Sequence, residues 1–283
     1  MKATRRFMRE WQLVLPLCIF FVAFVLAPLA MLAFVSSYTD PSLTVHGATQ
    51  YQKFFGDGFN LSILGQTLWL ALRTTVLAVI LGFPLAYAYS RASARQQRII
   101  ILLIIMPLLT SSVVRTFAWI VILGRQGIIN NVLLGAGILE RPLSMLYTPG
   151  AVVVALAQVE LPLMTLPIIT ALSKIDPNLI LASRSLGARQ WRTFLLIVVP
   201  LSMPGLLAGC LLVFAAASSA FVVHTLIGGG QNIFMPLYIY QQGIQANNYP
   251  FAAAIAMVLL VSVMVVVTAA NMAGRYTRGW HNA

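Results

Sequence analysis

Residues 251–273 read FAAAIAMVLLVSVMVVVTAANMA, and this stretch decides the fold class of the protein. It closes a longer run, Thr193–Gly274, in which 82 residues include no Asp, Glu, Lys or Arg. One membrane-spanning helix needs about 20 predominantly apolar residues, so this run is too long for a single crossing. The polar stretch Gly228–Pro250 divides it into two predicted membrane helices, 204–226 and 251–273.

The composition of the whole chain agrees with a membrane protein. Of its 283 residues, 60% are hydrophobic and 8% are charged, and the mean hydropathy is +0.89. Soluble proteins carry about 25% charged residues, so a soluble enzyme is excluded. The net charge of +12 would indicate a nucleic-acid partner in a soluble protein. In a membrane protein the basic residues can instead set the orientation of the chain, and their positions decide between the two interpretations.

Four further apolar runs complete a prediction of six membrane helices in one all-α domain, residues 1–283. The first run, Leu13–Val35, exceeds the apolar core of a signal peptide, about 7–15 residues, and is taken as a retained span. The predicted spans are 13–35, 67–89, 99–123, 148–172, 204–226 and 251–273.

The loops between these spans differ in charge. The N-terminus, the second loop, the fourth loop and the C-terminus hold 13 basic residues, whereas the opposite loops hold three. The first set is Lys2, Arg5, Arg6, Arg9, Arg91, Arg95, Arg98, Lys174, Arg184, Arg189, Arg192, Arg275 and Arg278. Basic residues concentrate in cytoplasmic loops, so both termini are expected in the cytoplasm. The basic excess therefore fixes topology, and we expect no nucleic-acid partner.

A chain that hydrolyses ATP itself needs a phosphate-binding loop ending in Gly-Lys-Ser or Gly-Lys-Thr. The lysines are Lys2, Lys53 and Lys174, and none of them follows a glycine. We therefore expect a chain that is not an enzyme and binds no cofactor, which leaves a channel, a carrier or the membrane part of a larger machine.

Other kinds of site have little support in the sequence. The cysteines, Cys18 and Cys210, are distant from each other, and with three scattered histidines they form no metal-ligand pattern. His224 lies near Ser218 and Ser219, which allows an intramembrane protease as a hypothesis, although small polar residues in membrane helices more often serve helix packing.

The fourth loop contains the signals of a short helix. Asp176 is a good N-cap because its carboxylate can accept hydrogen bonds from the first turn, and Pro177 suits the first helical position. Gly187 can adopt the left-handed conformation that ends a helix. The pattern predicts a helix over Pro177–Leu186, between spans four and five.

Two faces of this helix are candidates for different contacts. We expect Leu179, Ala182, Ser183 and Leu186 to pack on the membrane helices. Leu181, Arg184 and Ala188 lie on another side and could face a partner. The helix is either a connector that caps the bundle or a docking helix for a cytoplasmic motor, and its geometry alone does not separate the two.

At this point the residues resemble the EAA loop of binding-protein-dependent ABC importer permeases. The resemblance rests on Asp176-Pro177, Leu186-Gly187-Ala188, Phe194, Val199-Pro200-Leu201 and Met203-Pro204-Gly205. Further pieces in the same order resemble the spermidine/putrescine-type (polyamine) permeases. They are Pro84–Ala88, Pro107–Trp119, Gly127–Asn130, Leu161–Met164 and Leu226–Gly229. The resemblance runs from about residue 60 to the end of the chain.

The resemblance implies an all-α, six-span permease whose coupling helix docks an ATPase subunit. The implied docking loop consists of Asp176, Pro177, Leu181, Ala182, Ser183, Arg184, Leu186, Gly187, Ala188 and Arg189. One departure is that Leu181-Ala182-Ser183 stands where the family has Glu-Ala-Ala. A triplet that lacks the acid fits one half of a non-identical permease pair.

The resemblance also implies the partners and the location. Two cytoplasmic ATP-binding subunits would use ATP and Mg²⁺, a second and non-identical permease would complete the pore, and a periplasmic or extracellular binding protein would deliver a polyamine or related solute. The chain would lie in the lipid bilayer of the bacterial inner membrane.

A few residues are candidates for the translocation path or its gate: Ser111, Arg115, Glu160, Gly228 and Gly229. Charged residues inside spans usually face a bundle interior or a water-filled path. Arg115 is expected to have a structural or gating role, and Glu160 either pairs with an arginine or meets a cationic solute. The glycines allow a tight turn at the outer mouth or a mobile gate.

Two rival functions remain compatible with the residues alone. The chain could be a self-sufficient channel or secondary carrier, in which the fourth loop is an ordinary connector. It could also be a structural membrane protein that assembles partners and transports nothing.

Overall fold

The structure, a computed structural model, describes residues 15–230 and 232–279. Six helices within this part of the chain are long and apolar enough to cross a membrane. They are Leu15–Ser36, Gly58–Arg91, Ser112–Gly135, Pro149–Leu172, Gln190–Ser219 and Tyr249–Gly274. The prediction of an all-α protein with six membrane spans is confirmed. Lys2, Arg5, Arg6 and Arg9, which the topology prediction uses, lie outside the described residues, as do Leu13 and Val14 of the first predicted span.

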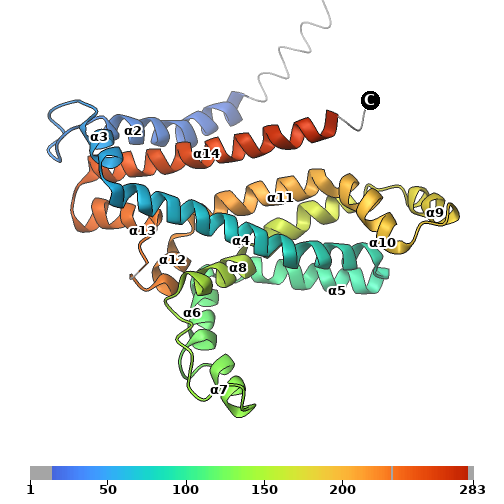
Figure 1. The fold of residues 1–283 in the computed structure, drawn as a ribbon. Coiled ribbons are helices and arrows are strands. Elements are labelled where there is room, and N and C mark those ends of the chain that lie inside the picture. Colours follow the sequence, from blue (N-terminus) through green and yellow to red (C-terminus); the bar gives the residue numbers. More distant parts are fainter. Residues whose placement is uncertain (1–14, 231, 280–283) are drawn as a thin grey trace, which may run out of the picture. The chain divides into compact units, whose positions relative to one another are not determined.

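The helical elements follow one another along the chain, and the longer connections precede α3 and α8 (Figure 1). In chain order they are η1 (Val22–Leu26), α2 (Ala27–Ser36), α3 (Thr49–Gly56), α4 (Gly58–Arg91), α5 (Ala94–Ile105), η2 (Met106–Leu109), α6 (Ser112–Leu123), α7 (Ile128–Gly135), α8 (Pro149–Leu172), α9 (Pro177–Ser185), α10 (Gln190–Thr193), η3 (Phe194–Val198), α11 (Val199–Ser219), α12 (Phe221–Gly228), α13 (Met235–Tyr240), η4 (Gln241–Gln245) and α14 (Tyr249–Gly279).

The chain divides into two compact units. The first comprises the residues up to Leu61 together with Tyr238–Val261, and the second comprises Ser62–Leu237 together with the residues from Ser262. All candidate site residues lie in the second unit.

The first unit is held by buried polar contacts beside an aromatic cluster. Asn60 is buried, and its Oδ1 accepts a hydrogen bond of 2.8 Å from the hydroxyl of Tyr238. Lys53 places its ammonium group 4.4 Å from the centroid of the Phe251 ring. A cation over an aromatic face gains about 0.5–1 kcal/mol at an exposed site. The Lys53–Phe251 contact therefore holds α3 beside the start of α14, and the Asn60–Tyr238 bond joins α4 to α13.

In the second unit, α8 is the most deeply buried span and packs along α11 (Figure 1). Gly205 and Gly209 make this close packing possible. A Cβ added at Gly205 would lie 2.3 Å from the carbonyl oxygen of Pro167, and one added at Gly209 would lie 2.9 Å from that of Met164. Glycines four residues apart let helix backbones approach closely in membranes, where packing drives association. The Gly205–Gly209 pair therefore sets the distance between α8 and α11.

The same region of α8 receives α4. Gly82 faces α8, and a Cβ added there would lie 2.9 Å from Cγ of Met164. Met164 is fully buried and belongs to a core cluster that includes Ala78, Ile168 and Val213. Three helices thus meet around one methionine.

The predicted third span, 99–123, is not one helix. The chain leaves α5 through the 3₁₀ turn η2, which contains Pro107, and Thr110 has an extended backbone. Ser111 then caps α6, which begins a new helical direction. Proline and the cap residue interrupt the backbone hydrogen bonding, whereas hydropathy, which stays high across the break, gives no sign of it.

The predicted fifth span, 204–226, has different bounds in the structure. The helix already begins at Gln190 and passes Pro200 and Pro204 without ending. It ends at Ser219, since Ala220 has a non-helical ψ of 83°, and α12 follows. Membrane helices tolerate internal proline because neighbouring groups satisfy the freed carbonyls, so Pro204 does not mark the start of this helix.

Candidate functional site

The predicted loop helix is present as α9, and both of its ends are capped. Asp176 is the N-cap, and its Oδ1 accepts a hydrogen bond of 2.9 Å from the backbone N–H of Asn178. Pro177 occupies the first helical position. The helix ends one residue earlier than predicted, at Ser185.

The C-terminal end of α9 has the geometry of a Schellman motif. Gly187 has φ of +80° and donates its N–H to the carbonyl of Arg184 at 2.9 Å. The next residue, Ala188, donates to the carbonyl of Ser183 at 3.1 Å. These two bonds satisfy carbonyls that the helix end would otherwise leave free. The left-handed backbone explains why glycine stands at this position.

A side-chain contact ties α9 to the next helix. The hydroxyl oxygens of Ser183 and Thr193 lie 2.8 Å apart. Thr193 ends α10, is buried, and leads directly through η3 into α11. The loop residues Ala188 and Arg189 connect the two helices, and Arg189 is the N-cap of α10. Ser183 therefore links the loop helix to a membrane span.

The prediction for the buried face of α9 is partly wrong. Ile180 and Ser183 point inward, whereas Leu179 is 47% exposed and Leu186 is 88% exposed. Ala182 is exposed as well. On this short helix the predicted buried side and the observed buried side are neighbours. The hydrogen bond between Ser183 and Thr193 turns the side that contains Ile180 and Ser183 toward the bundle.

The residues expected to face a partner have mixed positions. Leu181 and Arg184 are exposed and line a hollow beside the end of α4, and Ala188 is half-buried. Leu186 and Leu181 are exposed, and Trp191 is 69% exposed. Exposed large apolar side chains in one loop are candidates for an interaction surface.

Aromatic rings anchor the loop to α4. Phe194 lies against Trp191 in a stacked arrangement with ring centroids 5.6 Å apart. On its other side Phe194 meets Tyr87 of α4, with centroids 4.9 Å apart and ring planes at 70°. Aromatic pairs in these arrangements contribute about 0.5–1.5 kcal/mol beyond area burial, so the loop has a fixed position on the bundle.

Within the spans, Arg115 and Glu160 come from α6 and α8. Arg115 Nη1 donates to the carbonyl oxygen of Val159 at 3.4 Å, which places the guanidinium beside the residue that precedes Glu160. Among the described residues, neither side chain has an ion-pair partner within 4.0 Å. Glu160 lies at the middle of α8 and is half-buried. The positive charge of Arg115 nevertheless acts on the Glu160 carboxylate from a longer distance.

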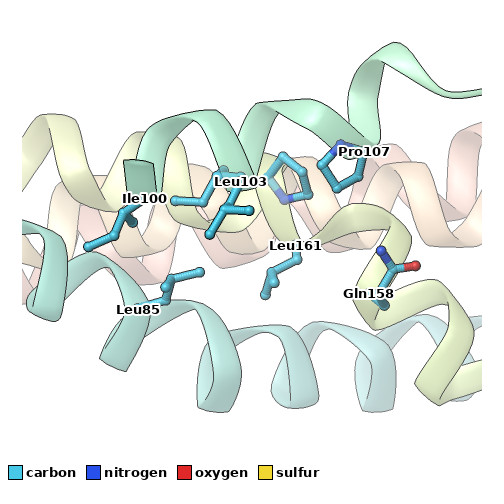
Figure 2. Close-up of a pocket in the computed structure, with 8 residues that line it drawn as sticks. Leu85, Ile100, Leu103, Pro107, Gln158 and Leu161 are labelled. Atoms are coloured by element: carbon cyan, nitrogen blue, oxygen red, sulfur yellow. The ribbon is translucent and has the colours of Figure 1, made fainter. Parts of the chain in front are cut away.

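An apolar hollow of about 120 Å³ lies next to this pair, between α4, α5 and α8 (Figure 2). Gln158 is the polar residue in its lining, and its Oε1 accepts a hydrogen bond of 3.2 Å from Trp119 Nε1. Leu161 and Pro107 lie on its wall, and neither Glu160 nor Arg115 lines it. The hollow therefore offers no charged group to a solute.

Ser111 serves the backbone. Its Oγ accepts a hydrogen bond of 3.3 Å from the N–H of Val113 and begins α6 after the break. This contact gives Ser111 a structural position at the start of α6, a short distance along that helix from Arg115.

Gly228 and Gly229 end α12 in a tight turn. Gly229 has φ of +64°, and a Cβ added there would lie 2.1 Å from Cδ1 of Tyr147. Gly230 follows with φ of +70°, and Asn232 donates to the carbonyl of Tyr147 at 2.9 Å. Glycine at 229 is required both by the backbone conformation and by the ring that covers it.

Several residues of this region were not found from the sequence. The Trp119–Gln158 bond had no local signal, because its partners are 39 residues apart. Thr193 lies ten residues from Ser183, in the next helix, so no pattern within one helix indicates their contact. His224 is fully buried against Phe234, with neither ring nitrogen hydrogen-bonded.

The serines near His224 are engaged elsewhere. Ser218 donates to the carbonyl of Phe214, and Ser219 donates to carbonyls of its own helix. A serine nucleophile needs hydrogen-bond contact with its base, and the structure gives this histidine no such contact with either serine.

The fold resembles solved ABC transporters. It superposes with a TM-score of 0.77 on a chain of the bacterial alginate ABC transporter solved in complex with an alginate pentasaccharide-bound periplasmic protein, covering 98% of this chain and 97% of that one at 20% identity. A chain of the MetNI methionine ABC transporter gives a TM-score of 0.60 at 17% identity, covering 76% and 94% of the two chains. At these identities the likeness concerns the fold alone.

Sequence comparison defines the family. Residues 78–278 match the family model described as binding-protein-dependent transport system inner membrane component. The spermidine/putrescine transport system permease protein PotB of Escherichia coli K12 is 33% identical over 205 residues, covering 72% of this chain and 74% of that protein. The PotB protein of Haemophilus influenzae is 31% identical over 250 residues, covering 87% of both.

The chain therefore belongs to the family of binding-protein-dependent transport system inner membrane components. It is a multi-pass inner membrane protein and a permease subunit of an ABC importer. The loop helix α9 and the pair Arg115–Glu160 both lie within the matched residues.

Proposed function

We propose that this permease passes a small cationic solute of the polyamine class. The PotB relatives, which carry spermidine/putrescine in their name, support this solute class through their identity over most of the chain. The observation that carries the proposal within the molecule is Glu160. It is the acidic residue in the described spans, it lies at the middle of α8, and within the described residues it forms no salt bridge, although the positive charge of Arg115 acts on it from nearby.

A carboxylate in the middle of a membrane span favours passage of a cationic solute over an anionic one. A polyamine that is partly dehydrated in a pore loses hydration of its ammonium groups, and a carboxylate replaces part of that stabilisation. An oxyanion would be repelled by the same group. This distinction matters because the molybdenum transport system permease protein ModB of Mycobacterium bovis is also 31% identical over 198 residues.

The proposed assembly contains parts that this chain does not supply. Two ATP-binding subunits would hold ATP and Mg²⁺, with one of them docked on Asp176–Arg189. A second, non-identical permease would complete the pore, and a soluble protein would deliver the solute at the outer face. The exposure of the apolar side chains of Leu181, Leu186 and Trp191 supports a protein contact at the loop. Both termini would be cytoplasmic, as the distribution of basic residues favours.

The contacts of α9 suggest how docking would reach the path. A displacement of α9 would pull on Thr193 through Ser183, and Thr193 continues into α11. Because α11 packs on α8 without intervening side chains at Gly205 and Gly209, a shift of α11 would move α8. Glu160 lies on α8, so its access would change with the state of the ATPase.

Transport in proteoliposomes tests this function. The complex is reconstituted with ATP inside, and uptake of labelled spermidine, putrescine and molybdate is measured with and without the solute-binding protein. We expect ATP-dependent uptake of a polyamine and none of molybdate. Uptake of molybdate alone would contradict the solute class, and uptake of a polyamine without ATP or partners would contradict the ABC importer assembly.

A further inference from the structure

The structure brings two arginines from distant loops to one hollow. Arg91 ends α4, and Arg184 lies in the last turn of α9. Both line a hollow of about 310 Å³ that also includes Ser90 and Pro177. The remaining lining side chains are apolar or aromatic: Tyr87, Leu172, Ile175, Ile180, Leu181 and Val198.

The two guanidinium groups have no acidic partner. Among the described residues, no ion pair involves Arg91 or Arg184. Arg91 lies over the ring of Tyr87, with its Cζ 5.0 Å from the centroid. The nearby carboxylate of Asp176 is the N-cap of α9 and accepts from the N–H of Asn178. Asp176 keeps its charge next to the lining residue Pro177, so the two arginines leave an excess of one positive charge around the hollow.

The position of the hollow defines its surroundings. Arg91 and Leu172 are at the ends of two membrane spans, Gly58–Arg91 and Pro149–Leu172. Tyr87 is an aromatic residue at this end of α4, and such residues concentrate where membrane and water meet. The ends of these spans are expected at the depth of the lipid headgroups, so the hollow would lie at that depth.

We propose that this hollow binds one anionic phospholipid of the leaflet on the basic side of the membrane. The phosphate would lie between Arg91 and Arg184, because arginine matches phosphate oxygens with paired N–H donors. An acyl chain would lie against Ile175, Ile180 and Val198. Basic pockets between membrane helices on the cytoplasmic side bind anionic headgroups in this way.

A lipid in this place would connect α4 with α9. Its phosphate would bind both arginines at once, and in this way it would stabilise the position of the loop helix although Arg91 and Arg184 do not contact each other. This inference goes beyond the proposed solute and does not depend on it, because lipid binding can be measured without transport.

Lipid titration of the delipidated, purified complex tests the site. Phosphatidylglycerol or phosphatidylcholine is added in mixed micelles, and binding is followed by native mass spectrometry and by the melting temperature of the complex. We expect phosphatidylglycerol to bind with clear preference. Arg91→Gln and Arg184→Gln should each weaken its binding about fivefold, and the double variant about 25-fold.

Two further variants separate charge from shape. Arg95→Gln removes a positive charge from the same loop, but Arg95 does not line the hollow, so phosphatidylglycerol binding should stay as in the wild type. Ser90→Phe fills the hollow and keeps both arginines, so it should weaken binding through lost room for the lipid.

Three results would overturn the proposal. The first is equal binding of phosphatidylglycerol and phosphatidylcholine by the wild type, which needs no variant to fold. The second is stabilisation by millimolar inorganic phosphate equal to that by the lipid, which would make the ligand a free phosphate. The third concerns the double variant. If it loses the ATPase subunit when phosphatidylcholine is the only lipid present, and if it still binds phosphatidylglycerol as the wild type does, the arginines contact a protein partner.

Discussion

The hydroxyl of Ser183 on α9 lies 2.8 Å from the hydroxyl of Thr193, ten residues further along the chain at the end of α10. Thr193 is 3% exposed and Ser183 is half-buried, so this bond is partly shielded from water. It is a direct side-chain connection between the loop helix and the helix that becomes α11, beside the packing of Ile180. The position of α9 on the bundle therefore depends in part on a neutral hydrogen bond.

A double-mutant cycle should measure this bond. Ser183→Ala and Thr193→Val each remove one hydroxyl, and their coupling in the free energy of unfolding should be about 1 kcal/mol. If α9 transmits motion through this contact, both single variants should still bind the ATPase but show less solute uptake per ATP hydrolysed. A coupling near zero together with normal uptake would mean that the contact transmits nothing.

Gly187 should not tolerate a β-branched residue. Its φ of +80° is unfavourable for valine by about 1–3 kcal/mol, so Gly187→Val should distort the end of α9 and lower both ATPase co-purification and uptake. Gly187→Asn is the matched control, because asparagine tolerates the left-handed region. Equal complex formation by the two variants would show that the docking surface does not depend on this helix end.

Glu160→Gln should lower uptake of a cationic solute. The substitution keeps shape and hydrogen bonding but removes the charge, and a hydrogen bond to a charged group is worth about 1.5–3 kcal/mol, or about tenfold and more in rate. The amount of assembled complex should stay constant. Glu140→Gln, in a loop outside the spans, is the control and should leave uptake unchanged.

The outcome of that experiment also separates the two roles of Glu160. Loss of assembled protein would favour an internal pair with Arg115, since stranding a buried partner charge costs about 3–5 kcal/mol. Normal uptake and normal assembly would mean that the carboxylate does not meet the solute.

Gly205→Leu should prevent close packing of α8 and α11. The added Cβ would lie 2.3 Å from the carbonyl oxygen of Pro167 and 2.6 Å from Cβ of Ala171, so the helices must separate. Overpacking costs about 1–3 kcal/mol or more, and the melting temperature and yield of the complex should fall. Gly65→Ala is the control, because no heavy atom lies within 4 Å of a Cβ added there; an equal loss for both variants would contradict the packing argument.

Reporter fusions should reveal the topology. Fusions after Arg95 or Arg189 should be cytoplasmic, and insertions near Asp57 or Gln245 should be external, because basic residues favour cytoplasmic loops. The measurement is the activity of compartment-specific reporters, with thiol labelling as a second readout. Labelling of a cysteine at position 245 from the cytoplasmic side alone would disprove this orientation.

The sequence by itself determined features that depend on nearby residues. The length and hydropathy of each run determined a six-span α-helical protein, because the bilayer requires internally satisfied backbone groups over about 20 residues. The caps Asp176 and Gly187 determined the loop helix, since each acts on backbone groups within a few residues.

The tertiary structure alone decided which groups meet across the chain. It placed Ile180 and Ser183 on the buried side of α9 in place of Leu179 and Leu186, and it broke the third predicted span at Thr110. It also brought Arg91 and Arg184, remote in sequence, to one hollow. A short helix with apolar residues on several sides has no strong preference for one buried face. Contacts with other helices therefore select that face. Such contacts cannot be predicted from the residues of the short helix alone.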